Sequence, residues 1–373
     1  MIIGVPREIK DGEYRVAVTP TGVREFIRTG HNVIVEAGAG LGSGFYDDAY
    51  TRAGATIALR EQAWEKADMI FKVKEPLPSE WTKFKPGQIL FTYLHLAASY
   101  EKDVAEAMMK ADVRAIAYET VETPRGHPLL APMSRVAGRL AIQAGATALQ
   151  KNNGGSGVLL GGIPGVPPAK VVIIGGGTVG VSAAKMAVGA HARVVILEKD
   201  ADRLAYLDDI FGGRVETMLS NEATVEEALD GADLTVGAVL LPGGAQAPHL
   251  VKRAMLKNMG AGSVLVDVAI DQGGCFETSR PTTHSDPTYV VDGVVHYCVT
   301  NMAGAVARTS TLALSGVTLP YACHIASKGF EQAVKDEPAL APGVNVYRGN
   351  LTIESVAQAH GLPYTPLTEV MAV

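Results

Sequence analysis

The chain of 373 residues has little cysteine, and its histidines lack the spacing of a metal site. Its three cysteines are odd in number, far apart and not in CxxC spacing, at Cys275, Cys298 and Cys323. We therefore expect reduced core thiols in place of a disulfide framework or a zinc site. The nine histidines form neither HxxxH nor HxH pairs, so we predict no metal.

Long apolar runs and basic clusters are also missing. No apolar run reaches the roughly 18 residues of a membrane span, so we predict no membrane partner. The start, MIIGVPREIK, carries charges where a signal peptide is apolar, which predicts a cytoplasmic protein. The net charge is -6 at pH 7 and no Lys/Arg stripe forms, so we expect no nucleic-acid partner.

Glycine, in contrast, is in excess. There are 41 glycines in 373 residues, or about 11%, against a usual value of roughly 7%. Ten of them lie in the 27-residue window from Gly154 to Gly180, without a collagen-like triplet period. Such clustering is typical of backbone that approaches a ligand closely, or of a hinge.

The chain has the composition and the rhythm of two α/β domains. Hydrophobic residues make up 47% and charged residues 19%, so a large core can form. Short apolar runs alternate with helix-like segments, which is typical of parallel sheets. We expect strands at Met1–Val5, Asn32–Glu36, Met69–Val73, Ile89–Leu94, Val113–Ala117, Val171–Ile174, Arg193–Leu197, Leu234–Gly237 and Val264–Val268. We expect helices at Thr21–Thr29, Tyr100–Lys110, Ser134–Leu149, Leu312–Ile325 and Glu354–His360.

The tail from Thr309 to Val373 has few strand signals and reads as helices. So short a tail has little core of its own, and we therefore expect it to pack on the first domain.

A dinucleotide-binding fingerprint follows the apolar run Val171–Ile174. Gly175, Gly177 and Gly180 fit GxGxxG, and a helical pattern runs on to Ala190. The first glycine permits a tight turn, the second lets a pyrophosphate touch backbone, and the third lets the helix pack on the strand. The helix N-terminus offers free N–H groups to phosphates. The pattern favours a nicotinamide cofactor over a flavin, and over a glycine-rich turn without a ligand.

Glu198 ends the second apolar run of this unit, 18 residues after Gly180. Its carboxylate can accept hydrogen bonds from the adenosine ribose hydroxyls and would repel a 2′-phosphate. We therefore predict NAD as the cofactor in preference to NADP.

Three titratable residues close predicted strands, where open parallel sheets bind ligands. Lys74 offers a positive charge to a carboxylate or a carbonyl oxygen, and Arg15, in the loop EYRVAVTP, could add a second clamp on a carboxylate. His95 can exchange protons near neutral pH. Asp271 can orient the histidine, hold an amine or stabilise a cation. Each could instead be a solvated or loop-capping side chain, and Asp267 competes with Asp271 for one role.

Three further residues lie where the second domain leaves and rejoins the first. Ser134 begins the linking helix and suits an N-cap as well as a cofactor contact. The amide of Asn301 beside the thioether of Met302 suits a nicotinamide pocket, and core packing explains Met302 equally well.

With these residues in place, the chain resembles the bacterial alanine dehydrogenases. Related chains are the lysine-forming dehydrogenases and the first domain of proton-translocating transhydrogenase. The resemblance spans nearly the whole chain, in order. It rests on GVPREIKDGEYRVAVTP (Gly4–Pro20), FKVKEP (Phe71–Pro76), FTYLHLA (Phe91–Ala97), PMSRVAGRLA (Pro132–Ala141), GVLLGGIPGVPPAKVVIIGGGTVG (Gly157–Gly180), VLVDVAIDQGGCFETSRPTTH (Val264–His284) and NMAGAVARTST (Asn301–Thr311).

The resemblance implies reversible, NAD-dependent oxidative deamination of L-alanine to pyruvate and ammonium by a homo-hexamer. It implies an α/β fold of two Rossmann-like domains with parallel sheets and the active site in the cleft between them. The substrate domain would comprise residues 1–128 plus 307–373, and the NAD-binding domain residues 129–306.

The resemblance also assigns roles to single residues. Catalysis falls to His95 and Asp271, and substrate binding to Arg15 and Lys74. The implied cofactor contacts are Ser134, Gly175, Gly177, Thr178, Val179, Gly180, Glu198, Asn301 and Met302.

The chain departs from the family pattern near the cofactor. Glu198 stands where many members have aspartate, and Arg135 replaces a residue that is often acidic. His191-Ala192 replaces a glycine-containing step, and Met302 lacks the proline that commonly follows it. These departures bear on cofactor affinity and loop geometry, and they leave the four substrate and catalytic residues in place.

Two other function classes remain as alternatives. A transhydrogenase-like hydride carrier would need a partner subunit and no carboxylate clamp, and the presence of both Lys74 and His95 argues against it. A non-enzymatic NAD-binding sensor would show a broken catalytic set, which this sequence does not.

Overall fold

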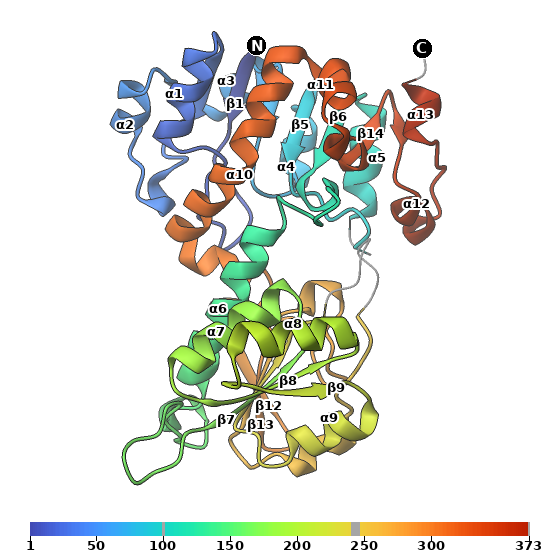
Figure 1. Cartoon of the computed structure of the whole chain (residues 1–373). Coiled ribbons are helices and arrows are strands. Elements are labelled where there is room, and N and C mark those ends of the chain that lie inside the picture. The colour runs from blue at the N-terminus through green and yellow to red at the C-terminus, as the bar shows by residue number, and fades with distance from the viewer. Residues whose placement is uncertain (99–100, 240–246, 372–373) are drawn as a thin grey trace. The chain divides into compact units, whose positions relative to one another are not determined.

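The computed structural model describes residues 1–98, 101–239 and 247–371, and it divides the chain into two compact units (Figure 1). Unit 1 comprises Met1–Met133 and Gly304–Val373, and unit 2 comprises Ser134–Ala303. The assignment of a substrate role to one unit and an NAD role to the other stays a prediction. Within the described ranges, no helix combines the length and the apolar character that crossing a bilayer requires.

Unit 1 is built on a sheet with the strand order β15-β14-β6-β5-β4-β1-β2-β3. Strands β1 to β6 run parallel, whereas β14 pairs antiparallel with β6 and β15 with β14. The order reverses between β1 and β4, the kind of position where open α/β sheets bind ligands. The strands are β1 (Ile2–Val5), β2 (Asn32–Glu36), β3 (Thr56–Ala58), β4 (Met69–Phe71), β5 (Ile89–Thr92), β6 (Arg114–Ala117), β14 (Val344–Tyr347) and β15 (Asn350–Leu351).

Helices connect the parallel strands of unit 1 and form most of its C-terminal segment. The first begins where the Thr19 side chain accepts a hydrogen bond from Gly22 N, with Pro20 in the first turn, where its missing N–H costs nothing. The helices are α1 (Pro20–Arg28), α2 (Asp47–Arg52), α3 (Arg60–Glu65), α4 (Pro78–Trp81), α5 (Lys102–Lys110), α10 (Ala307–Lys328), α11 (Phe330–Asp336), α12 (Glu354–His360) and α13 (Leu367–Val370). Short 3-10 turns are η1 (Leu41–Ser43), η2 (Tyr118–Thr120) and η8 (Pro338–Gly343).

Unit 2 is built on a second sheet, with the order β12-β13-β11-β10-β7-β8-β9. Six of its strands, β13, β11, β10, β7, β8 and β9 in sheet order, run parallel, whereas the edge strand β12 pairs antiparallel with β13. The order reverses between β7 and β10, directly beside the glycine fingerprint. The strands are β7 (Lys170–Ile174), β8 (Arg193–Glu198), β9 (Glu216–Leu219), β10 (Leu234–Gly237), β11 (Val264–Asp267), β12 (Thr288–Val291) and β13 (Val294–Tyr297).

Helices cover both faces of the unit 2 sheet, as Figure 1 shows. Val171 and Ile173 of β7 join the core under α7 (Thr178–Gly189) and α8 (Ala201–Phe211). Val172 and Ile174 point the other way, into the core with α9 (Glu222–Leu229). Burial on both faces explains why this strand is a continuous apolar run. The remaining elements are α6 (Ala131–Ala148), η3 (Lys151–Asn153), η5 (Arg253–Asn258), η6 (Ile270–Gln272) and η7 (Met302–Val306).

All nine expected strands form, and the missed ones lie at or near the sheet edges. Strands β3, β9 and β12 are partly exposed and β15 has only two residues, so none of them forms a long buried apolar run. Strands β13 and β14 are largely buried, but each is four residues long and is interrupted by a polar residue, His296 or Asn345. The tail is not purely helical as expected, because Val344–Tyr347 forms β14. Its pairing with β6 confirms that the tail packs on the first domain. Tyr100, the first residue of one expected helix, lies outside the described residues.

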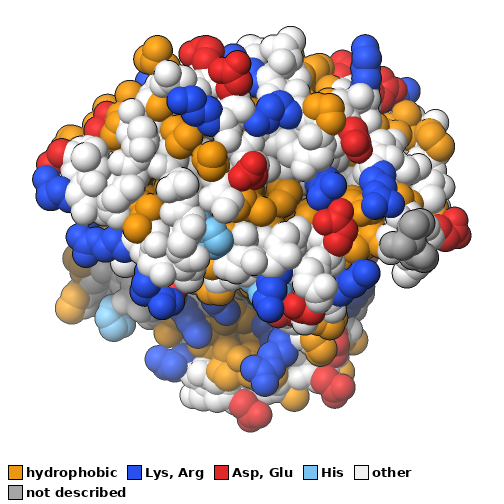
Figure 2. Space-filling model, turned by 90° about the horizontal axis from the view of Figure 1, so that it is seen from above, with side chains coloured by type: hydrophobic (Ala, Val, Ile, Leu, Met, Phe, Trp, Pro, Cys, Tyr) orange, Lys and Arg blue, Asp and Glu red, His pale blue; other side chains and the backbone are white. Residues whose placement is uncertain are grey.

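Acidic and basic side chains are interspersed on the face drawn in Figure 2. Some surface arginines pair with a carboxylate of their own helix: Arg28 with Glu25 in α1, and Arg52 with Asp48 in α2. Exposed pairs of this kind contribute little to stability.

Candidate active site

The glycine fingerprint forms a tight turn between β7 and α7. Gly175 has φ +105°, and a β-carbon built on it would lie 2.7 Å from the Ala238 carbonyl oxygen. Gly180 lies so close to the same turn that a β-carbon on it would overlap the Gly175 carbonyl oxygen. Both positions therefore require glycine for the fold of unit 2 itself.

Gly177 has a different environment from the other two glycines. Among the described residues, no atom lies within 4 Å of a β-carbon built on Gly177. The residue is the N-cap of α7, so the free N–H groups of Thr178 and Val179 follow it directly. Open backbone at a helix N-terminus is what a phosphate needs, so the loop fits the pyrophosphate of a dinucleotide.

Glu198, at the end of β8, lies against this loop. Its Oε2 accepts a hydrogen bond from Gly176 N at 2.8 Å, and its Oε1 accepts one from Lys199 N at 2.7 Å. Arg203 of α8 donates from Nε to the Gly176 carbonyl oxygen at 2.7 Å and stacks on the Tyr206 ring. Sequence reasoning missed Arg203, which no motif singles out.

The two aspartates that competed for one role have different environments. Asp267 is fully buried at the end of β11, and its carboxylate accepts hydrogen bonds from Ala269 N at 3.0 Å, Cys275 N at 2.9 Å and Ser279 Oγ. Burial raises the pKa of this carboxyl, and the donors around it oppose that rise. Asp267 thus closes the loop that carries Asp271, which is exposed in η6.

Three predicted cofactor contacts lie near the border of unit 2: Asn301 in a loop, Met302 in the core and Ser134 in helix α6. Asn301 adopts a left-handed φ of +59°, and its carbonyl oxygen is hydrogen-bonded to His284 Nε2 at 3.3 Å. Met302 is 4% exposed and belongs to the core of unit 2. Met302 therefore packs in this core, and its contact with a cofactor stays a prediction.

The expected start of the linking helix at Ser134 was wrong, which excludes the N-cap alternative for Ser134, and its cofactor contact stays a prediction. Helix α6 begins at Ala131, whose N–H donates to the His127 carbonyl oxygen at 3.0 Å. Pro132 in the first turn lacks only an N–H that would have no helical partner, so the helix starts earlier than its apolar pattern indicates. Ser134 consequently lies one turn inside the helix.

In unit 1, Arg15 is held by a buried carboxylate. Its side chain is 3% exposed and forms a bidentate pair with Glu13, with Nε–Oε1 at 2.7 Å and Nη2–Oε2 at 2.5 Å. Its Nη1 lies 3.2 Å from Met133 Sδ. Burial opposes the charge of the guanidinium, but Glu13 outweighs burial and raises the pKa of Arg15. Glu13, which sequence reasoning missed, fixes the direction of this cation.

Lys74 follows β4 and lies in a cluster of opposite charges. Its Nζ is 3.9 Å from Glu75 Oε2, and Glu75 also pairs with Lys10. Burial opposes ionisation of Glu75, but Lys74 and Lys10, with a smaller contribution from His95, lower its pKa below the usual value. Glu75 therefore interacts electrostatically with two of the predicted site residues, Lys74 and His95.

The side chains of Glu8, Lys72 and Glu80 form a buried triad of two carboxylates and one ammonium group, which supports the end of β4. Lys72 Nζ lies 3.0 Å from Glu8 Oε2 and 3.1 Å from Glu80 Oε1, and all three side chains are almost fully buried. Glu8 Oε1 accepts a hydrogen bond from Val73 N at 2.6 Å and a longer one from Lys74 N at 3.4 Å. The triad thus fixes the backbone that presents Lys74.

His95 follows β5, beside β4 in the sheet. Its ring is half-buried and stacks on Tyr93, with ring centroids 5.5 Å apart and the planes at 6°. Tyr93 in turn donates from its hydroxyl to the Leu129 carbonyl oxygen at 2.7 Å. Arg15, Lys74 and His95 therefore lie in the loops after β1, β4 and β5 of one sheet, whereas Asp271 and the cofactor candidates belong to unit 2.

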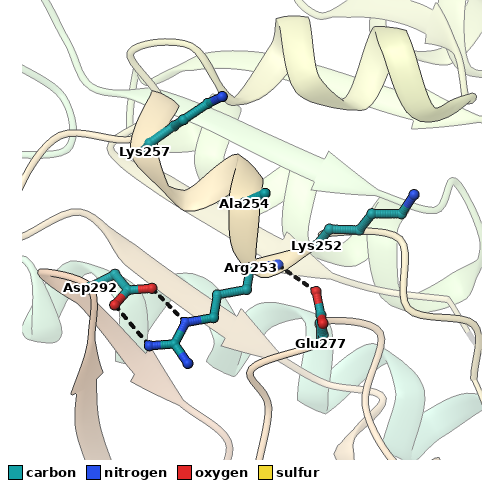
Figure 3. A pocket seen from close by; sticks show the side chains of 6 residues that line it. All are labelled: Lys252, Arg253, Ala254, Lys257, Glu277 and Asp292. Carbon is teal, nitrogen blue, oxygen red and sulfur yellow. Dashed lines mark hydrogen bonds and ion pairs between the residues drawn. The ribbon is translucent and has the colours of Figure 1, made fainter.

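An open pocket of 690 Å³ lies elsewhere in unit 2, around η5 (Figure 3). Arg253 is held there by Asp292 at 2.8 and 3.0 Å, and its backbone N–H donates to Glu277 at 2.7 Å. Lys252 pairs with Glu222. These basic side chains are already paired at the surface, and none of the predicted site residues lines the pocket.

Two family models match the chain. The model described as alanine dehydrogenase/PNT, N-terminal domain, matches residues 4–137, and the model described as alanine dehydrogenase/PNT, C-terminal domain, matches residues 141–354.

Curated relatives match over nearly the full length of both chains. The alanine dehydrogenase of Methanococcus maripaludis is 56% identical over 374 residues, with 100% of both chains covered. The alanine dehydrogenase of Bacillus subtilis is 56% identical over 373 residues, with 100% of this chain and 98% of its own covered.

Solved structures agree with these matches. An L-alanine dehydrogenase shares 51% identity with a TM-score of 0.92, covering 97% of this chain and 99% of its own. A transhydrogenase from Sinorhizobium meliloti shares 25% identity with a TM-score of 0.79, covering 95% of this chain and all of its own. The resemblance stated from the sequence is confirmed, and the chain belongs to the alanine dehydrogenase/PNT family.

Proposed function

We propose that this chain is an alanine dehydrogenase that catalyses the reversible, NAD-dependent oxidative deamination of L-alanine. L-Alanine, NAD⁺ and water give pyruvate, ammonium, NADH and a proton. The observation that carries the proposal is the set of Arg15, Lys74 and His95 after neighbouring strands of one sheet, in a chain with full-length likeness to curated alanine dehydrogenases.

Arg15 and Lys74 would bind the substrate carboxylate. The Lys74 ammonium is 3.9 Å from Glu75 Oε2, beyond hydrogen-bond length, so its protons can turn to a substrate oxygen. In the reductive direction the same ammonium would polarise the pyruvate carbonyl. Met133 and the buried Tyr93 belong to the surroundings of Arg15.

His95 would move the protons of the hydration step. Loss of hydride from C2 leaves an iminium, which must add water and then release ammonia. The imidazole can take a proton from the attacking water and return it to the leaving nitrogen. The exposed carboxylate of Asp271 would hold the amine and stabilise its positive charge.

The family implies a nicotinamide dinucleotide, which when bound supplies the hydride acceptor. The loop from Gly175 to Gly180 would hold its pyrophosphate, and the carboxylate of Glu198 its adenosine ribose. Further contacts would come from Ser134, Asn301 and Met302. The charge of Glu198 is our reason to propose NAD over NADP.

A homo-hexamer in the cytoplasm is the expected form of the enzyme and rests on the family resemblance. Light scattering on the purified full chain tests the assembly, because a hexamer has six times the chain mass of 39.1 kDa. A monomer or dimer would contradict it.

An NADH-consumption assay with the purified chain tests the function. Pyruvate with ammonium should oxidise NADH without any partner protein, while pyruvate alone should not. Glyoxylate and larger 2-oxo acids measure the side-chain range. Activity that needs a second protein would instead favour the hydride carrier, and NADH binding without turnover would favour the sensor.

Point variants then test the roles of single residues. His95→Ala and Asp271→Asn should lose turnover and keep NADH binding, and Lys74→Ala should lose pyruvate binding. Near-normal turnover in His95→Ala would contradict its role as the proton carrier.

A further inference from the structure

His95 has a backbone conformation that residues with a β-carbon rarely adopt. Its φ is +49°, in the left-handed region. This conformation costs an L-residue about 1–2 kcal/mol relative to the right-handed one. Neighbouring groups must therefore hold the segment in place.

The carboxylate of Glu119 provides the main contact to this backbone. Glu119 lies in η2, just after β6, and β6 is the neighbour of β5 in the sheet. Its Oε1 accepts a hydrogen bond from His95 N at 2.6 Å, and both oxygens lie 3.3 Å from Leu94 N. Two consecutive backbone N–H groups thus converge on one carboxylate, which is the arrangement of an anion-binding nest.

Other contacts hold the same segment from different directions, among them the hydrogen bond between His360 Nε2 and the Leu96 carbonyl oxygen. The Tyr93 ring stacks on the imidazole, and the Ala98 N–H donates to the His95 carbonyl oxygen at 2.9 Å. None of these contacts reaches the N–H groups of Leu94 and His95. The Glu119 carboxylate therefore holds the N-terminal side of the His95 φ torsion, opposite the contacts to the carbonyl groups of His95 and Leu96.

We propose that Glu119 is a positioning residue, whose carboxylate holds the His95 imidazole where it exchanges protons with the substrate. The role rests on the proposed function, since it assumes that His95 moves protons. Charge-assisted hydrogen bonds are about twice as strong as neutral ones, so the carboxylate suits the task. Without the Glu119 carboxylate, the His95 backbone relaxes and the imidazole moves, which lowers the rate of proton transfer. Arg15 and Lys74, which would bind the substrate carboxylate, stay in place.

Three variants of the full chain test this role in the alanine oxidation assay. Glu119→Ala removes the acceptor, and we expect kcat to fall about 10- to 100-fold while the KM for alanine and the NADH affinity stay within about twofold. Glu119→Gln keeps one acceptor oxygen without the charge, and we expect an intermediate fall, of about 3- to 10-fold.

Asp47→Ala is the matched control. The Asp47 carboxylate also accepts hydrogen bonds from a backbone N–H of unit 1, that of Gly38, at 2.9 and 3.2 Å. We expect its kcat to equal that of the wild type. Added formate should restore part of kcat in Glu119→Ala by occupying the vacated nest, and should not raise kcat in the wild type.

The outcomes separate this proposal from the proposed function. A wild-type chain without alanine oxidation overturns both. Wild-type kcat in Glu119→Ala overturns the positioning role alone, as does a joint loss of kcat, alanine KM and NADH affinity, which indicates a general structural role. If Glu119→Ala does not fold, Glu119→Gln decides, because unchanged kcat in that variant overturns the proposal.

Discussion

Gly180 packs against Gly175 so closely that a β-carbon on Gly180 would overlap the Gly175 carbonyl oxygen, whereas no atom of the described residues lies within 4 Å of a β-carbon on Gly177 between them. The three glycines of one fingerprint therefore serve two separate purposes. The outer two let β7 and α7 meet, and the middle one leaves the helix N-terminus accessible.

This difference predicts opposite behaviour of two alanine variants. Gly177→Ala should keep the thermal stability of the wild type but lose NADH affinity, because its methyl group occupies the space for the pyrophosphate. Gly180→Ala should destabilise unit 2 by several kcal/mol, because backbone must move to admit the methyl group. Calorimetric melting and NADH titration of both variants check this. Equal Tm losses in the two variants would contradict it.

The charge of Glu198 should set the choice between NAD and NADP. Glu198→Gln keeps an oxygen that accepts from Gly176 N and removes only the negative charge. We expect the ratio of NADPH to NADH affinity to rise by about tenfold, which corresponds to 1.4 kcal/mol. Isothermal titration with both cofactors measures the ratio, and an unchanged ratio would refute the assignment.

The buried triad should contribute strongly to the stability of unit 1. Lys72→Met leaves the Glu8 and Glu80 carboxylates buried without a cation, which costs about 3–5 kcal/mol. Both tryptophans of the chain, Trp64 and Trp81, belong to unit 1, so urea unfolding followed by tryptophan fluorescence reports this unit. Arg52→Ala, which breaks an exposed pair, is the control and should leave the curve unchanged. A Lys72→Met midpoint equal to that of the control would exclude the predicted contribution.

Glu101 should make stability depend on pH. Burial, with Glu75 adding to it and Lys10 and Lys74 opposing it, raises the pKa of Glu101 to about 7 from its usual 4.5. A carboxyl whose pKa is higher in the folded chain stabilises the fold below its unfolded pKa, and this contribution is lost as pH rises through the folded pKa. Glu101→Gln should therefore match the wild-type Tm near pH 5 and exceed it near pH 8.

Thermal melts across this pH range check the Glu101 prediction. Glu106→Gln is the control, since Glu106 is exposed on helix α5, whose N-cap residue is Glu101, and its Tm difference from the wild type should not grow with pH. A Tm difference between Glu101→Gln and the wild type that stays constant across this pH range would contradict the raised pKa of Glu101.

Local patterns were enough to predict most of the buried strands and the glycine turn after β7. The run Val171–Ile174 and the glycines after it lie within ten residues, so their spacing alone carries the information. The edge strand Thr56–Ala58 was missed because partial exposure leaves it no apolar run. The start of α6 was misplaced because its first turn, with Ala131 and Pro132, carries no apolar periodicity.

The supporting carboxylates could not be predicted in the same way. Glu119 contacts His95 only because β5 and β6 are neighbours in the sheet, and Glu8 reaches Val73 only because β1 lies beside β4. Strand order is a property of the folded chain, and a carboxylate 24 residues away from its partner has no spacing signal.

The discontinuity of unit 1 has a consequence for how the chain is made. The 170 residues of Ser134–Ala303 are synthesised between the two segments of unit 1, and the last 70 residues, Gly304–Val373, emerge after all of them. Until then β6 has no β14 partner, so the nascent chain carries an open sheet edge that can pair with other chains. Early folding of unit 2 on the ribosome would shorten the loop to be closed and reduce the time at risk.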